Sequence, residues 1–322
     1  MNNVLINACG IKSLGGINVL ESSIKNIKKN SNVQILVSDR ELEKRLSSGG
    51  INNIVVEQKP RFTHPFLLLF VNKDLRDWVN SFDATIHFGN FGFKTKTKDI
   101  VFIQNILPYS NRSVSLKNIL LRYFINKSIE FSSIAVVQNE HVIDYLPPKF
   151  RSKVISIGKI SQTNINTSKG KGIIAISNTL PYKNIDFIEN VMDKLSEALN
   201  EEYKITLITE ENRNMSSSKV TYITSLSSKQ VEAELKKHSI YFHASSVETL
   251  CLPIFEAQEN GLMVVAPNLD YALNAVQEKK YLYKYQDSSN AIDSIHSAVK
   301  DLNKINSLTI NVYSESWKEI LK

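Results

Sequence analysis

Short runs of Val, Ile and Leu alternate with longer amphipathic stretches along the chain. In the first half these apolar runs predict strands over residues 4–8, 33–37, 53–57, 84–88, 100–104 and 134–138. In the second half they predict strands over residues 172–177, 204–209, 219–223, 239–243 and 263–267. Strands that alternate with helical segments are typical of β-α-β units and of parallel sheets. The pattern therefore predicts an α/β fold with two doubly wound parallel sheets.

Helices are predicted between these strands. The clearest covers residues 115–130, where apolar side chains from Leu116 to Phe124 follow a period of 3.6 residues. Ser227 and Gln230 have the spacing of a capping box, which predicts that a helix begins at Ser227. The polar segment 158–172 has no periodicity, and we interpret it as the linker between two domains.

Length and composition narrow the class of protein. With 322 residues, 42 % apolar and 22 % charged, the chain excludes collagen-like, low-complexity and wholly disordered proteins. Cys9 and Cys251 are too few for a disulfide framework or a four-cysteine zinc site, which indicates a reducing compartment. The longest apolar run, residues 66–71, is too short to span a bilayer, and the N-terminus lacks the basic start of a signal peptide. We therefore expect a cytoplasmic protein.

The net charge of +7 is distributed unevenly. Residues 1–165 contain 22 basic and 12 acidic side chains, whereas residues 166–322 contain 17 basic and 20 acidic ones. A basic half fits nucleic acid, an anionic membrane surface, a phosphate-bearing substrate or simply a solvated face, and charge alone does not choose among them. The chain has no long Lys/Arg block, RNA-recognition signature or zinc-finger spacing, which disfavours nucleic acid.

The segment 243–267 carries the most chemical information. An apolar strand is followed by a polar turn, by Pro253 at the start of a predicted helix, and by Gly261 as the expected C-terminal cap. Backbone NH groups between Thr249 and Leu252, together with the positive end of the helix dipole, would suit a diphosphate. Two carboxylates, Glu248 and Glu256, lie on either side of this turn. A carboxylate near a helix N-terminus can also serve only to stabilise the helix.

This segment resembles the donor-site signature of retaining GT-B glycosyltransferases of the family 4 (group 1) type, in which S-x-x-E-G-F-G-L-P-x-x-E-A-x-x-x-G is usual. The chain reads S-x-x-E-T-L-C-L-P-I-F-E-A-x-x-x-G. The resemblance implies that Glu256 accepts hydrogen bonds from the ribose of a nucleotide diphosphate sugar and that Glu248 contacts the donor sugar. Leu250 and Cys251 replace the usual Phe and Gly, so the turn is bulkier, and Cys251 is better interpreted as a packing residue than as a nucleophile.

Further elements extend the resemblance over most of the chain. Residues 175–184 are similar to a family loop that ends in a diphosphate-binding Lys, here Lys183, while Asn178 replaces the usual Arg. Gly15 and Gly16 follow the first strand, like the loop that lets the backbone approach the donor phosphate. Gln104 and Asn105 are similar to a family element whose His is replaced by Gln104. Because a neutral amide is no general base, these two side chains would position sugar hydroxyls.

The resemblance also implies an architecture. It predicts GT-B organisation, in which two Rossmann-like domains face a cleft. The expected parts are an acceptor-side domain at 1–165, a donor domain at 166–305 and a C-terminal helix at 306–322. In this interpretation Trp317 anchors the helix to the N-terminal domain.

The implied activity is transfer of a hexose from a UDP- or GDP-type sugar nucleotide to a glycan or polyprenyl-diphosphate-linked acceptor, with retention of anomeric configuration. The setting would be bacterial surface polysaccharide biosynthesis, such as O-antigen of lipopolysaccharide. No Asp-x-Asp motif occurs and the six His are scattered, so we expect neither a metal nor a cofactor. The basic segment 115–127 is expected either to lie on an anionic membrane surface, which would make the protein peripheral at the cytoplasmic face, or to pack into the core.

Two alternatives stay open. The same fold also carries sugar-nucleotide epimerases and hydrolases, which would convert the donor without an acceptor. A non-catalytic GT-B partner protein would keep the fold and use only its basic domain at a membrane. The departures at Asn178, Leu250 and Cys251 favour the second alternative, whereas Lys183, Glu248 and Glu256 argue against it.

Overall fold

The computed structural model divides into two compact units. Unit 1 comprises Met1–Lys159 and Ser314–Lys322, and unit 2 comprises Ile160–Tyr313. The structure describes residues 3–29, 31–56, 73–90, 92–110, 115–168, 170–198, 203–210, 219–224, 226–302 and 304–321. The apolar run 66–71 and residue 57 of the predicted strand 53–57 lie outside these ranges.

Unit 1 is built on a seven-stranded parallel sheet with the order β3-β2-β1-β4-β5-β6-β7. Its strands are β1 (Asn3–Asn7), β2 (Asn32–Val37), β3 (Ile54–Val56), β4 (Ala84–His87), β5 (Lys98–Ile103), β6 (Ile134–Val137) and β7 (Val154–Ser156). Strands β1, β4, β5 and β6 are buried over nearly their whole length. Burial on both faces explains the continuous apolar runs in β1, β5 and β6. The strand order is that of a Rossmann-type sheet.

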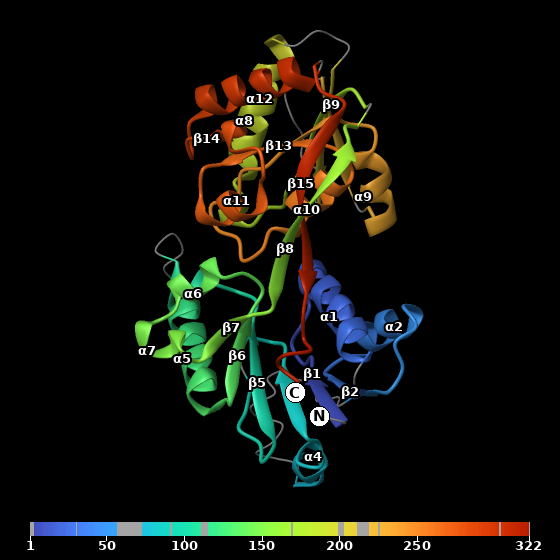
Figure 1. The fold of residues 1–322 in the computed structure, drawn as a ribbon, viewed down its shortest axis with the longest axis vertical. Coiled ribbons are helices and arrows are strands. Elements are labelled where there is room, and N and C mark those ends of the chain that lie inside the picture. Colours follow the sequence, from blue (N-terminus) through green and yellow to red (C-terminus); the bar gives the residue numbers. More distant parts are fainter. Residues whose placement is uncertain are drawn as a thin grey trace. The chain divides into compact units, whose positions relative to one another are not determined.

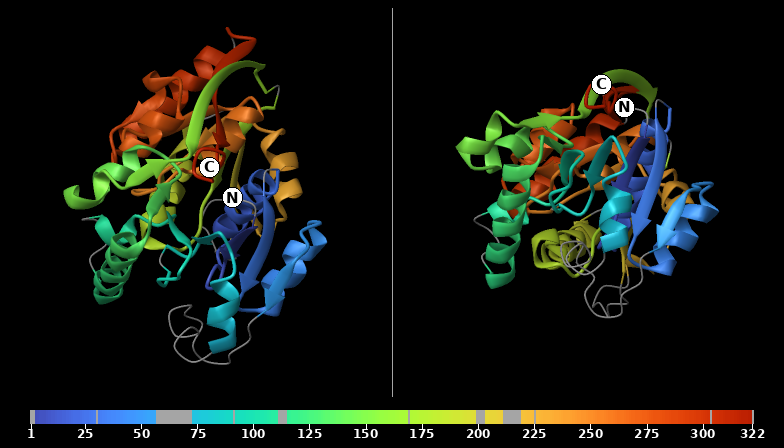
Figure 2. Two further views of the ribbon diagram at one scale, coloured as in Figure 1. Left: turned by 60° about the horizontal axis from the view of Figure 1, so that its bottom comes forward. Right: turned by 90° about the horizontal axis from the view of Figure 1, so that it is seen from below.

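Helices surround this sheet (Figures 1 and 2). They are α1 (Leu14–Ile27), α2 (Arg40–Ser48), α4 (Lys73–Val79), the 3-10 turn η1 (Leu107–Tyr109), α5 (Leu116–Phe131), α6 (His141–Tyr145) and α7 (Pro148–Arg151). Helices α1, α2 and α5 begin at residues whose side-chain oxygens accept backbone NH groups, namely Ser13, Asp39 and Ser115. These caps satisfy donors that would otherwise lack a partner. The predicted helix 115–130 is confirmed as α5.

Unit 2 repeats the winding with a second parallel sheet, ordered β11-β10-β9-β12-β13-β14. Its strands are β9 (Gly172–Ile176), β10 (Lys204–Thr209), β11 (Val220–Thr224), β12 (Ile240–Phe242), β13 (Met263–Pro267) and β14 (Leu282–Tyr283). The central strand β9 lies between β10 and β12, which is the point at which the winding reverses. Ligands bind at such a point in open α/β sheets. The predicted fold class of two Rossmann-like parallel-sheet domains is confirmed.

The helices of unit 2 cover its sheet on both faces. They are the 3-10 turn η2 (Pro181–Lys183), α8 (Ile185–Ala198), α9 (Ser228–Leu235), α10 (Leu252–Glu259), α11 (Asp270–Ala275), the 3-10 turn η3 (Lys279–Tyr281) and α12 (Ser288–Leu302). Helices α8 and α12 lie side by side in Figure 1, and Lys194 of α8 donates a hydrogen bond to Ser288 of α12. The predicted capping box at Ser227 and Gln230 is confirmed at the start of α9.

Two segments differ from the sequence-based prediction. The polar segment expected as a linker contains strand β8 (Gly158–Asn166), and the expected C-terminal helix is instead strand β15 (Ser307–Glu315) followed by a turn. These strands pair with each other, and Thr167 bonds to Asn306 while Ser316 bonds to Ile157, so they run in opposite directions. The β-branched residues of β15 favour an extended backbone, and β8 supplies the hydrogen-bond partner that local periodicity cannot reveal.

The C-terminal turn packs on unit 1, to which it belongs. Trp317 is almost fully buried there and contacts Phe88, with ring centroids 5.8 Å apart, and Phe102, at 5.5 Å. Lys98 also donates a hydrogen bond to the carbonyl of Ile320. In Figures 1 and 2 the two chain ends lie beside each other on this unit.

Candidate active site

The loops after β9 and β12 meet at the carboxyl edge of the sheet in unit 2. These strands are neighbours, so the segments that leave them are brought together although they are about 65 residues apart in sequence. The backbone NH of Ser246 donates to the carbonyl of Tyr182 over 2.7 Å. The Asn184 side chain donates to the carbonyl of Ala244 over 2.9 Å, from a left-handed backbone conformation. These bonds hold the two loops in a fixed register.

Lys183 and Glu248 form an ion pair at this junction, with Nζ and Oε1 2.6 Å apart and both side chains largely buried. Burial opposes the charge of the ammonium, but the Glu248 carboxylate outweighs this effect and raises the pKa of Lys183. Burial likewise favours the neutral form of Glu248, while Lys183 and then His243 lower the pKa of that carboxyl. Each charge therefore keeps the other ionised.

The turn that follows Glu248 leads into helix α10. Cys251 is the cap residue and has φ 62° and ψ 61°, in the left-handed region. A side chain in that conformation costs about 1–2 kcal/mol relative to glycine, the residue that the resemblance predicts here. The Leu250 and Cys251 side chains are both buried in one hydrophobic cluster, so the extra bulk of the turn points into the core. Leu252 begins the helix, and the Ile254 NH bonds back to the Cys251 carbonyl.

Glu256 lies on α10 and is half-buried. Burial and then the charge of Glu259 raise the pKa of Glu256. Its carboxylate makes no hydrogen bond or ion pair with any residue in the described ranges. A half-buried charge without a partner is unfavourable in the protein alone and becomes favourable when a ligand donates hydrogen bonds to it.

Asn178 lies in the loop that leads to Lys183. Its side-chain oxygen accepts the backbone NH of Leu180 over 3.1 Å and so shapes the loop. The Lys183 carbonyl in turn accepts a hydrogen bond from Ser177 over 3.2 Å. Asn178 therefore has a local structural role at the position where the resemblance predicts a cation.

Buried aromatic and thiol groups surround the ion pair. His243 Nε2 lies 3.2 Å from Cys251 Sγ and 3.7 Å from Glu248 Oε1, and its Nδ1 lies 3.2 Å from the Tyr241 hydroxyl. Burial lowers the pKa of His243 to about 4. Burial, then the charge of Glu248, raises the pKa of the Cys251 thiol. Sequence reasoning missed His243, because only the left-handed turn at Cys251 brings the thiol back toward the imidazole.

Unit 1 assembles the remaining predicted residues. Gly15 and Gly16 lie in the first turn of α1, where the NH of Gly16 donates to the capping oxygen of Ser13 over 3.2 Å. A Cβ on Gly16 would lie 3.9 Å from Gln104 Oε1, so these two positions are adjacent. The backbone NH groups of Gln104 and Asn105 both donate to the Asn90 side chain, over 2.6 and 2.7 Å. The loop after β5 is therefore held in place beside the start of α1.

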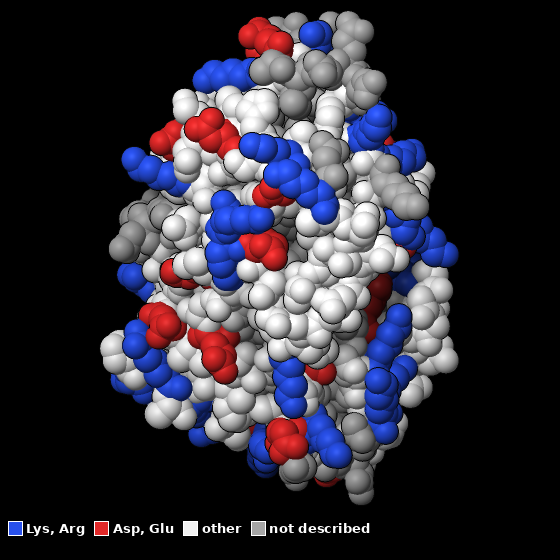
Figure 3. All heavy atoms as spheres, turned by 45° about the horizontal axis from the view of Figure 1, so that its top comes forward, with Lys and Arg blue, Asp and Glu red and all other residues white. Residues whose placement is uncertain are grey.

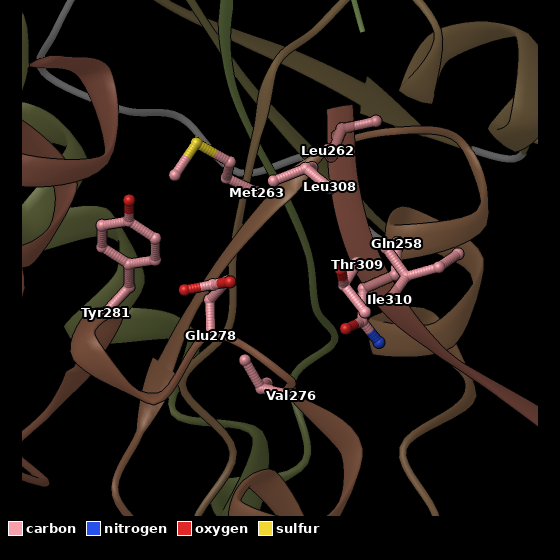
Figure 4. A pocket seen from close by; sticks show the side chains of 9 residues that line it. All are labelled: Gln258, Leu262, Met263, Val276, Glu278, Tyr281, Leu308, Thr309 and Ile310. Atoms are coloured by element: carbon pink, nitrogen blue, oxygen red, sulfur yellow. The ribbon is translucent and has the colours of Figure 1, made fainter. Parts of the chain in front are cut away.

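Two hollows differ in size and character. The one in unit 2, between Val276, Tyr281 and Ile310 (Figure 4), has a volume of about 20 Å³, which holds about one water molecule and no sugar nucleotide. The one in unit 1 has a volume of about 490 Å³ and opens beyond the carboxyl ends of β1 and β2. Its lining includes Lys12, Asp39, Glu41 and Arg45. Its size is in the range of small-molecule sites.

Helix α5 exposes an apolar stripe. Leu116, Ile119, Leu120 and Tyr123 recur at helical spacing and are between 47 and 74 % exposed. The prediction that this part of the helix packs into the core is therefore wrong, since only its later residues Ile125, Ser128 and Ile129 are buried. Lys117 and Arg122 are exposed on the same two turns.

On the face of the molecule drawn in Figure 3, basic and acidic side chains are interspersed. None of the described helices has the length and hydropathy needed to cross a bilayer.

Comparison with known proteins finds one matching family model and many similar folds. Residues 157–314 match the family model described as glycosyl transferases group 1. No curated protein sequence shows significant similarity to the chain. The fold is similar to HepE of Anabaena in complex with UDP and glucose, with a TM-score of 0.69, 14 % identity, and coverage of 94 % of this chain and 91 % of that one.

Two further solved structures have the same fold. A variant of S. aureus TarM in complex with Fondaparinux, alpha-GlcNAc-glycerol and UDP has a TM-score of 0.67 and 11 % identity, and 93 % of each chain is covered. Sucrose-phosphate synthase of Thermosynechococcus elongatus has a TM-score of 0.68 and 10 % identity, covering 94 % of this chain and 91 % of that one. The chain thus has the GT-B fold, and its residues 157–314 are similar to the group 1 glycosyl transferases.

Proposed function

We propose that this protein is a retaining glycosyltransferase of the family 4 type that moves a sugar from a UDP- or GDP-type sugar nucleotide to a glycan or lipid-linked acceptor of bacterial surface polysaccharide. The observation that carries the proposal is the buried Lys183–Glu248 pair at the point where the sheet of a group 1 glycosyltransferase domain reverses its winding. The UDP complexes of HepE and TarM support a nucleotide-linked donor.

The donor diphosphate binds between Lys183 and the N-terminus of α10. Lys183 is kept cationic and immobile by Glu248, so its charge is in place before the diphosphate leaves. The backbone of Thr249, Leu250, Cys251 and Leu252 adds the positive end of the helix dipole. Glu256, with its raised pKa and its carboxylate unpartnered among the described residues, accepts the ribose hydroxyls. Glu248 contacts hydroxyls of the donor sugar.

The reaction follows a front-face path. The bond between the anomeric carbon and the diphosphate oxygen breaks, and the acceptor oxygen bonds to the same face of that carbon. The leaving diphosphate oxygen takes the acceptor proton, so no side chain acts as the base. Lys183 and the α10 N-terminus stabilise the negative charge that develops, which needs no metal and no cofactor. Within unit 1, the substrate contacts are proposed to come from Gly15, Gly16, Gln104 and Asn105.

The acceptor binds unit 1. The hollow beyond β1 and β2 has the volume for a sugar and both signs of charge for its hydroxyls. The exposed stripe of α5 rests on the membrane that carries the acceptor, because its apolar side chains would enter the interface and Lys117 and Arg122 would meet anionic headgroups. The protein is therefore proposed to be peripheral at the cytoplasmic face of the inner membrane.

A donor panel tests the activity. A thermal-shift screen of UDP- and GDP-sugars should show a rise in Tm with the true donor. Product analysis with and without acceptor separates transfer from hydrolysis or epimerisation of the donor. Replacing both Lys183→Met and Glu248→Gln removes both charges and avoids leaving one buried alone. We expect this variant to lose about 100-fold or more in transfer rate. Lys204→Met is the control, because it breaks the Lys204–Glu234 pair in the same unit and leaves Glu234 paired with Lys237.

Vesicle sedimentation tests the membrane contact. The protein should pellet with anionic phosphatidylglycerol vesicles at low salt and be released as salt rises. The variant Leu120→Ser/Tyr123→Ser should stay in the supernatant, whereas Leu273→Ser, an exposed leucine of unit 2, should pellet like the wild type. Absence of pelleting at low salt would remove the membrane from the proposal and leave the transfer reaction intact.

A further inference from the structure

Three different metal-ligating side chains converge beside the Lys183–Glu248 pair. Donor atoms of His243, Glu248 and Cys251 all lie within 4.8 Å of one another. His243 Nε2 is 3.2 Å from Cys251 Sγ and 3.7 Å from Glu248 Oε1. In a tetrahedral zinc site, with bonds of about 2.0–2.3 Å, neighbouring ligand atoms are roughly 3.4–3.6 Å apart. The two separations that involve His243 differ from these by only a few tenths of an ångström, and Cys251 Sγ lies within 4.8 Å of a Glu248 carboxylate oxygen.

The groups around these three side chains hold the His243 imidazole in an orientation that suits metal binding. The Tyr241 hydroxyl lies 3.2 Å from Nδ1 of His243, and the two rings stack with centroids 5.9 Å apart, so the imidazole is fixed with Nε2 toward the thiol. Such outer contacts orient the ligands of zinc sites. Sulfur and imidazole nitrogen favour zinc over magnesium or calcium, which prefer oxygen.

From this convergence we propose that His243, Glu248 and Cys251 bind a zinc-class cation and that the bound cation competes with the sugar nucleotide. The thiol loses its proton to solvent when the metal binds, so that thiolate and carboxylate balance the two positive charges. The fourth position is left to water. The metal takes the Glu248 carboxylate from Lys183 and so removes the contact that orients the lysine. The metal site does not depend on the proposed function, whereas the competition with the sugar nucleotide rests on the proposed donor site.

Cobalt reports the site directly, because Co²⁺ occupies zinc sites and absorbs strongly when a thiolate binds it. We expect one Co²⁺ per chain, a sulfur-to-cobalt absorption band, and its displacement by Zn²⁺. The variant Cys251→Gly should abolish the band and still fold, since glycine readily adopts the φ of 62° found there. The matched control is Cys9→Ser, which removes the other buried cysteine and should keep the band.

Calorimetry with UDP- and GDP-sugars then tests the competition. At free Zn²⁺ ten times its Kd, the apparent Kd of the wild type for the donor should rise about tenfold, while that of Cys251→Gly should not change with Zn²⁺. A missing band, or one that survives in Cys251→Gly, overturns the metal site. A band with unchanged donor affinity overturns the competition. A protein that binds Co²⁺ through Cys251 but binds no sugar nucleotide without metal refutes the donor assignment and leaves the metal site standing.

Discussion

Replacing Glu256 by Gln tests the nucleotide assignment with the least change of shape. The carboxylate is half-buried, and burial and Glu259 raise its pKa, so the folded protein disfavours its charge. The stability that Glu256 contributes is present below the ordinary pKa of a Glu and is lost as pH rises through the raised pKa of the folded state. Glu256→Gln mimics the protonated form. We therefore expect the free energy of unfolding near pH 7 to increase in this variant.

Nucleotide affinity should change in the opposite direction. A hydrogen bond to a charged group contributes about 1.5–3 kcal/mol, which corresponds to a loss of about 10- to 150-fold in affinity. Because the ribose hydroxyls bind the ionised carboxylate, the donor affinity of the wild type should increase with pH through the raised pKa of Glu256. The affinity of Glu256→Gln should not show this increase.

Calorimetric titration with sugar nucleotides from pH 5 to pH 8 measures the affinity, and urea unfolding measures the stability. Glu259→Gln is the matched control. It removes an exposed carboxylate that lies one helical turn from Glu256, and burial also raises the pKa of this carboxyl. The control should keep the affinity and its pH dependence, apart from the loss of its repulsion on Glu256. Equal affinities of Glu256→Gln and wild type would refute the ribose contact.

Three further substitutions test the fold. Trp317→Ala should lower the free energy of unfolding by about 3–5 kcal/mol in urea, since it empties a buried aromatic cluster; a loss below 1 kcal/mol would contradict the docking of the C-terminal turn. Gly261→Ala should lower Tm markedly, because φ is 79° and the new Cβ would lie 2.5 Å from the Asn166 carbonyl oxygen; an unchanged Tm would show that this turn relaxes. Ser227→Ala should cost about 1 kcal/mol by removing the capping box with Gln230, which urea unfolding detects.

Local pattern was sufficient for most of the fold. Strands β1, β5, β9 and β13 are buried on both faces, and such strands are continuous apolar runs in any sequence. The capping box at Ser227 was also predictable, because it depends only on two residues that are three positions apart, Ser227 and Gln230. Strand β15 was not, because its hydrogen bonds go to β8, about 150 residues earlier, and its amphipathic composition also fits a helix.

Some features of the candidate site could likewise be predicted from the sequence, whereas others depend on tertiary contacts. The signature from Glu248 to Glu256 identified two carboxylates and a helix start, because their spacing is local. That Lys183 is paired with Glu248 depends on β9 lying next to β12. That His243 faces Cys251 depends on a left-handed turn which a cysteine adopts only where the surrounding core holds it.

Periodicity and short spacings in the sequence are enough to predict two Rossmann-type sheets, the position of the α10 N-terminus and the residue types around it. Which side chains meet there, which face of α5 is exposed, and that the C-terminal segment is a strand become known only from the folded chain. Those outcomes depend on contacts between residues that are distant in sequence. The free energy of such contacts cannot be inferred from a short stretch of the sequence.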